Sequence, residues 1–126
     1  MGVGIVPFYE PQVSDDAQFN GDGKGLAKDF DILNEVAIAA GLRPLRDFAE
    51  NEFEEYADET GSFELTYHPI GKGLATVEGL MKEIRSKPDV ATKLSDPDYA
   101  LEELEELARS LRVAERSGAR FCFFFM

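Results

Sequence analysis

An unbroken run of apolar side chains follows Arg120 and occupies positions 121–126 of the sequence. A strand with one face in water alternates apolar and polar residues, so this run predicts a strand that is buried on both faces. Left exposed, such a segment would be prone to aggregate, and helices are therefore expected to cover it. Successive side chains of the strand point to opposite faces, which places Phe121, Phe123 and Phe125 on one side and Cys122, Phe124 and Met126 on the other.

Two more strands are expected. Residues 2–9 read as a short strand in which Pro7 marks an edge, a bulge or the strand's end. This strand is a candidate neighbour for the C-terminal one. Alternation with period two predicts a further strand at 63–68, followed by a turn at 69–72.

Apolar residues spaced by three and four predict helices at 26–40 and 74–86. The clearest helix start has Asp96 as N-cap and Pro97 at the first helical position, and Gly118 ends this third helix. Segment 89–95 fits either a loop or a helical turn.

The order of these elements predicts the fold class. Strands and helices are mixed, and no regular strand-helix-strand spacing repeats, which favours α+β over a parallel α/β sheet. We expect one small α+β domain over residues 1–126. Three or more helices would pack on a short sheet that includes the N-terminal and C-terminal strands.

The charge is the most unusual bulk property of the chain. It has 25 Asp plus Glu against 13 Lys plus Arg, a net charge of −12 at pH 7. A field of this sign disfavours nucleic acids and anionic membranes, and it favours a basic protein partner or simple solubility. No stretch approaches the roughly 20 apolar residues of a membrane helix. Without a basic residue before the apolar N-terminal stretch, no signal peptide is expected, and a cytoplasmic location is the default.

Acidic residues are densest at 47–64, where eight acids occur without a base. Aromatic residues are interleaved with them, which favours an ordered segment over a disordered tail. We expect this segment to form a partner-binding surface, as in the small acidic proteins that neutralise toxins, an analogy of charge and size only. Its residues are Glu50, Glu52, Glu54, Glu55, Asp58 and Glu59.

Gly-Lys-Gly occurs twice, around Lys24 and Lys72, and each time it opens a predicted helix. Free backbone N–H groups at a helix start can bind an anion, so these lysines give an alternative function as an anion-binding or small-molecule-binding domain. Neither site fits a phosphate-binding loop, because Gln18 and Thr66 stand where its first glycine belongs. Turn and capping glycines are the plainer interpretation.

No cofactor, metal site or catalytic residue is predicted. Residues 19–24 resemble the core of an EF-hand calcium loop, but the match fails at its first, eighth and twelfth positions, which are Gln18, Gly25 and Asp29. His68 is the only histidine, which leaves no histidine cluster or triad within one chain. The sequence thus leaves the function unknown and favours a non-enzymatic role.

Self-association is a further expectation. The carboxylate of Met126 cannot be deeply buried without a partner, so the tip of the C-terminal strand should reach the surface. Apolar surface there could pair two chains into a homodimer.

Overall fold

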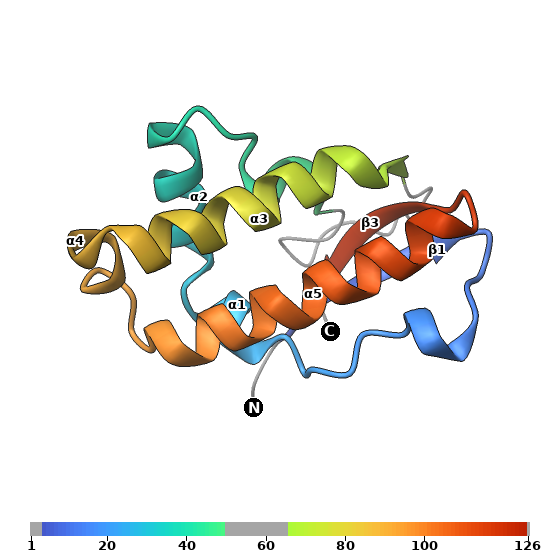
Figure 1. The fold of residues 1–126 in the computed structure, drawn as a ribbon, viewed down its shortest axis with the longest axis horizontal. Coiled ribbons are helices and arrows are strands. Elements are labelled where there is room, and N and C mark those ends of the chain that lie inside the picture. Colours follow the sequence, from blue (N-terminus) through green and yellow to red (C-terminus); the bar gives the residue numbers. More distant parts are fainter. Residues whose placement is uncertain (1–3, 50–65, 126) are drawn as a thin grey trace, which may run out of the picture.

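A computed structural model describes residues 4–49 and 66–125 (Figure 1). The described residues form three strands, five α-helices and two 3₁₀ turns. The strands are β1 (Ile5–Glu10), β2 (His68–Pro69) and β3 (Arg120–Phe125). The α-helices are α1 (Lys24–Lys28), α2 (Phe30–Ala39), α3 (Ile70–Ser86), α4 (Pro88–Ala91) and α5 (Pro97–Arg116), and the 3₁₀ turns are η1 (Asp15–Ala17) and η2 (Leu45–Phe48).

β3 is the central strand of an antiparallel sheet with the order β1-β3-β2. Ile5 lies opposite Phe125 and Glu10 opposite Arg120, which confirms that the N-terminal and C-terminal strands pair. Pro7 lacks an N–H group and is tolerated because β1 lies at the edge of the sheet. An edge position is one of the three alternatives that Pro7 suggested for this strand, the others being a bulge and the strand's end.

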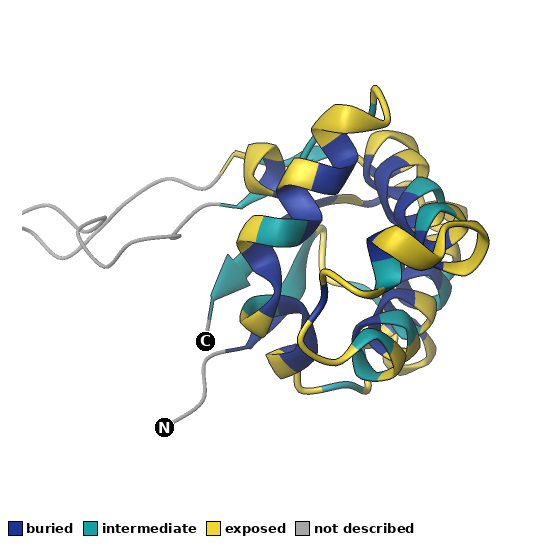
Figure 2. Ribbon diagram, turned by 90° about the vertical axis from the view of Figure 1, so that its left-hand side faces the viewer, coloured by how far each residue is buried: buried dark blue, intermediate teal, exposed yellow. Residues whose placement is uncertain are grey.

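Two long helices cover one face of this sheet. α3 and α5 run antiparallel and lie side by side (Figure 1). Seen from the side, buried residues gather on the inward sides of the helices and exposed residues on their outward sides (Figure 2). The arrangement is the expected one, a small α+β domain with helices packed on a short sheet that contains both terminal strands.

The phenylalanines of β3 form the centre of the core. Phe121 and Phe123 are fully buried, and their ring centroids lie 5.2 Å and 6.0 Å from that of Phe48. Phe125 meets Phe30 of α2 edge-on at 5.1 Å, so the helices do cover the face that these alternate residues share. Burial on both faces holds for the first part of the run only, because Phe124 and Phe125 are half-buried.

The structure corrects some of the expected element boundaries and resolves one segment that the sequence left open. The helix expected at 26–40 is broken into α1 and α2 at Asp29, whose buried carboxylate accepts a hydrogen bond from the N–H of Ser95. α3 begins at Ile70, so the turn expected at 69–72 was wrong beyond its first residue. The ambiguous segment after Pro88 starts with the short α4. Of the strand expected at 63–68, residues 63–65 lie outside the described residues, and β2 includes only His68 from the rest.

The start of α5 is as predicted. The Asp96 side chain accepts a hydrogen bond from the N–H of Tyr99, and Pro97 occupies the first turn. A cap of this kind satisfies one of the free N–H groups at a helix N-terminus. Spacing on this helix favours an ion pair between Glu105 and Arg109, four residues apart. Glu105 pairs instead with Arg85 of α3, and Arg109 pairs with Glu106 on the same helix.

Gly73 allows α3 to lie directly against the core strand. A Cβ atom added at Gly73 would stand 2.3 Å from Cζ of the buried Phe121 ring. We expect Gly73→Ala to lower the free energy of unfolding by about 1–3 kcal/mol, the usual cost of overpacking. Gly71 is the matched control in the same helix, because its nearest new contact would be Glu115 at 3.7 Å.

Gly71→Ala should leave the stability unchanged or raise it by a few tenths of a kcal/mol through helix propensity. Urea denaturation followed by circular dichroism measures both variants. Equal stability of the two would contradict close packing between α3 and β3.

Candidate functional site

The glycine-rich segment at 20–25, here called the glycine loop, is held on α5 by a buried carboxylate. Glu103 is only 4% exposed. Its Oε2 accepts a hydrogen bond from the N–H of Gly23 at 2.8 Å, and its Oε1 accepts from Gly25 at 2.8 Å and from Leu26 at 3.2 Å. The free N–H groups at the start of α1 are therefore satisfied by a side chain from the far end of the sequence.

Glycine is required in this loop for close approach. Gly23 has φ +72°, and a Cβ atom there would lie 2.0 Å from the carbonyl oxygen of Ile5. The N–H of Ile5 in turn donates to the carbonyl oxygen of Gly23 at 3.0 Å, which joins the loop to the first residue of β1. At Gly21 and Gly25 a Cβ atom would come within 3.0–3.2 Å of the Glu103 carboxylate. The loop can thus wrap the carboxylate only because its alternate residues have no side chain.

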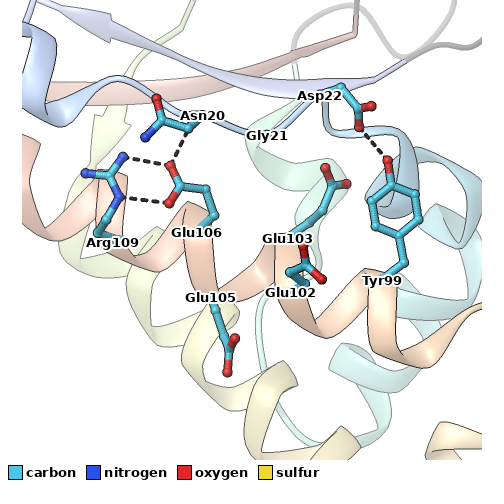
Figure 3. Close-up of a pocket in the computed structure, with 9 residues that line it drawn as sticks. All are labelled: Asn20, Gly21, Asp22, Tyr99, Glu102, Glu103, Glu105, Glu106 and Arg109. Carbon is cyan, nitrogen blue, oxygen red and sulfur yellow. Dashed lines mark hydrogen bonds and ion pairs between the residues drawn. The ribbon is translucent and has the colours of Figure 1, made fainter.

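Between the glycine loop and α5 lies an open groove of about 600 Å³, here called the acidic groove (Figure 3). Five of its lining residues are acids and one is basic. The lining residues are Asn20, Gly21, Asp22, Tyr99, Glu102, Glu103, Glu105, Glu106 and Arg109.

The single arginine of the groove is already paired. Arg109 donates from Nε to Oε1 of Glu106 at 2.8 Å and from Nη2 to its Oε2 at 2.7 Å. It also donates to the carbonyl oxygens of Asp16 and Gln18, and so anchors η1 and the residues after it on α5. The ion pair lowers the pKa of Glu106. Arg109 neutralises Glu106, and Arg85 of α3 pairs with Glu105, so the excess negative charge of the groove comes from Asp22, Glu102 and Glu103.

Asp22 and Tyr99 close one end of the groove. The Tyr99 hydroxyl donates to Oδ1 of Asp22 at 2.6 Å, and the N–H of Lys24 donates to the same oxygen at 3.0 Å. These bonds lower the pKa of Asp22, and the bond to Asp22 is the main cause that raises the pKa of Tyr99 to about 12. Asp22 is therefore charged and Tyr99 neutral at pH 7.

Burial raises the pKa of Glu103 above its ordinary value of 4.5, and the three backbone N–H bonds oppose this shift. An ionised carboxylate that leaves water loses hydration energy, while N–H donors return part of it. Glu103 is thus the acid of the groove that takes up a proton most readily among those whose pKa is shifted.

No group of three or more His, Cys, Asp or Glu side chains among the described residues is arranged to hold a metal ion. The hydroxyl pair of Tyr9 and Ser110 is structural, because Ser110 donates to the carbonyl oxygen of Ala17 and accepts from Tyr9 at 2.6 Å. Within residues 4–49 and 66–125, every helix is too short or too polar to cross a membrane.

The two lysines that the sequence singled out are not brought together. Lys24 and Lys72 are exposed at the starts of different helices, α1 and α3. At α1 the N–H groups of Gly25 and Leu26 that would bind an anion already donate to Glu103. The six acids of the expected partner-binding surface, from Glu50 to Glu59, lie outside the described residues.

Glu103 was not predicted from the sequence, although a signal for it exists. Position 103 follows Ala100 by three and precedes Leu107 by four, so it falls on the buried stripe of α5. An acid at such a position requires a polar partner in the interior. The glycine loop, read only as a turn, supplies that partner.

No protein-family model, no curated protein and no solved structure matches this chain.

Proposed function

We propose that this chain is a non-enzymatic binding domain whose acidic groove receives a basic segment of a partner protein. The observation that carries this proposal is the charge of the groove, in which five acids face a single arginine that is already paired with Glu106. Glu102 is exposed, and Glu105 is half-exposed and pairs with Arg85 of α3 at the surface, so both can reach a partner without unfolding the domain. The net charge of −12 adds long-range attraction for a cationic protein.

Tyr99 gives the groove a second property that suits a basic side chain. Arg and Lys bind favourably over the face of an aromatic ring, and an arginine also donates to carboxylates with its planar fork. The ring lies at the end of the groove beside Asp22 (Figure 3). An arginine-rich segment is therefore a better match than a lysine-rich one.

The proposal is tested with a hexa-arginine peptide as the probe and fluorescence anisotropy as the readout. The double variant Glu102→Lys/Glu105→Lys should weaken binding about ten-fold, and added salt should weaken binding to the parent chain. Glu35→Lys/Asp89→Lys is the matched control, because it changes the net charge equally with exposed acids away from the groove. If both double variants lose the same affinity, attraction is not localised to the groove and the proposal is wrong.

We propose a second partner-binding segment in the acids Glu50, Glu52, Glu54, Glu55, Asp58 and Glu59. Glu52→Lys/Glu54→Lys/Glu55→Lys should then reduce affinity for the same peptide as steeply as reversal in the groove. If the triple variant binds the peptide with unchanged affinity, these acids take no part in binding and only the groove binds the peptide.

The alternative function, binding of an anion or small molecule at Lys24 or Lys72, has less support. Glu103 occupies the N–H groups beside Lys24, and the surrounding acids repel an anion. A thermal-shift screen with inorganic phosphate and nucleotides tests it, because a ligand of the native state raises the melting temperature.

A further inference from the structure

We propose that a groove beside β1 binds an uncharged aromatic small molecule. This second groove, here called the aromatic groove, has a volume of about 370 Å³ and lies between β1 and segment 12–19. A volume of this size is within the range of small-molecule sites. The residues that line it are all different from those that line the acidic groove, so the proposal does not depend on the proposed function.

Hydrogen bonds to α5 hold the two walls of the aromatic groove in place. The first wall, β1, is fixed by its pairing with β3. The second wall is tied to α5, because Arg109 donates to the carbonyl oxygen of Asp16 at 2.7 Å. The Ser110 hydroxyl links both walls, since it donates to the carbonyl oxygen of Ala17 at 2.5 Å and contacts the Tyr9 hydroxyl at 2.6 Å. The groove is thus formed before a ligand arrives, which lowers the ordering cost of binding.

The lining of the aromatic groove indicates the class of ligand. None of the nine described residues that line it has a charged side chain, and four of them are aromatic, namely Phe8, Tyr9, Phe19 and Tyr67. Aromatic rings prefer other rings, in stacked or edge-on contact, beyond the burial of area alone. Gln12 and Gln18 are exposed and bring amide groups to the groove. An amide side chain both donates and accepts, so it can bind a hydroxyl or carbonyl group of the ligand.

Charge selects a neutral ligand for the aromatic groove. An anion is repelled by the net charge of −12, and a cation would find its counter-charges in the acidic groove instead. Burial raises the pKa of Tyr9 to about 12, so its hydroxyl also stays neutral at pH 7. An uncharged molecule enters such a groove without losing the hydration of an ion.

A peptide strand added to the edge of β1 is a poorer match than a small molecule. Strand addition requires a row of free backbone N–H groups along the edge. On the outer edge of β1, the N–H of Ile5 already donates to the carbonyl oxygen of Gly23 at 3.0 Å. Pro7, two residues further along the strand, is directed to the same edge and has no N–H group. The ligand is therefore held by ring faces and side-chain amides.

The test uses 2-naphthol, a neutral two-ring alcohol, as the probe and a ¹H–¹⁵N NMR titration of the whole chain as the readout. The amide signals of β1 and of segment 12–19 should shift, with a Kd of about 1 mM or below, the affinity expected for a ligand of this size. 2-Naphthoate is the matched anion, and it should bind about ten-fold more weakly because its charge loses hydration in the groove.

Two variants change the aromatic groove itself. Phe19→Ala removes one aromatic side chain and should weaken the binding of 2-naphthol about five-fold. Gln12→Ala removes one amide at an exposed position and should weaken binding about three-fold. Ile38→Ala is the matched control, because Ile38 is an exposed apolar residue of α2 that does not line the groove. This control should bind 2-naphthol with unchanged affinity.

Three results would each overturn the proposal. They are signal shifts scattered over the whole surface, equal binding of 2-naphthol and 2-naphthoate, and unchanged affinity in both groove variants. The ¹H–¹⁵N spectrum of Phe19→Ala also shows whether this variant folds. If it does not fold, Gln12→Ala alone decides the outcome, because truncation of an exposed side chain leaves the fold intact.

Discussion

Replacing Phe121 by alanine is expected to lower the free energy of unfolding by about 3–5 kcal/mol, the range for truncating a fully buried aromatic residue. The Phe121 ring is 0% exposed and lies between Phe48 and Phe123, at 5.2 Å and 5.0 Å between ring centroids. Gly73 of α3 faces the Phe121 ring and has no side chain, so it cannot fill the cavity that the truncation leaves. Urea denaturation followed by circular dichroism gives the change directly.

Phe8→Ala is the control for this experiment. Phe8 is a half-buried residue of β1 whose ring stacks on Phe124 at 4.6 Å. Truncation of Phe8 removes less buried apolar area, so we expect it to lower the free energy of unfolding by about 1–2 kcal/mol. A loss below about 1.5 kcal/mol for Phe121→Ala, or equal losses for the two variants, would be incompatible with β3 as the centre of the core.

Replacing Glu103 by alanine is expected to cost about 2–4 kcal/mol, because each backbone donor that loses its partner in a buried site costs about 1–3 kcal/mol and water from the groove can satisfy some of them. The donors are the buried N–H groups of Gly23, Gly25 and Leu26. Since the pKa of Glu103 is raised in the fold, the difference between parent and variant should be largest below pH 4.5 and shrink as the pH rises through that raised pKa.

Glu102→Ala provides the comparison, because Glu102 precedes Glu103 on α5 and is exposed. A surface truncation of this kind should change stability by no more than about 0.5 kcal/mol. Hydrogen exchange should also show lost protection at Gly23 and Gly25 in Glu103→Ala only. If the glycine loop stays protected without Glu103, another contact holds it, and the carboxylate is not its anchor.

The architecture could be predicted from local patterns. The apolar run at 121–125 indicated the central strand, and Asp96-Pro97 marked the start of α5, because each signal lies within a few neighbouring residues. The break at Asp29 could not be predicted in this way. At this break the Asp29 carboxylate accepts a hydrogen bond from the N–H of Ser95, 66 residues further along the chain, and no local pattern contains that partner.

The acidic groove could not be predicted from the sequence for a related reason. Its two walls come from residues 20–22 and 99–109, which the sequence separates widely. The sequence shows four acids at positions 102–106 and predicts a turn at the glycines, but it does not show that the two meet. That Glu103 stands on the apolar stripe could have been noticed, but which backbone amides it would meet depends on how α1 lies against α5.

The central place of β3 has a consequence for synthesis. β1 and β2 both pair with β3, which is synthesised after them. No strand pairing of this sheet can therefore form on a nascent chain that ends before residue 120. The helices would be synthesised first, and their apolar sides would stay uncovered until β3 is added. Arrest of translation within α5 should therefore yield a chaperone-binding intermediate, and release of the last strand should complete the fold in one cooperative step.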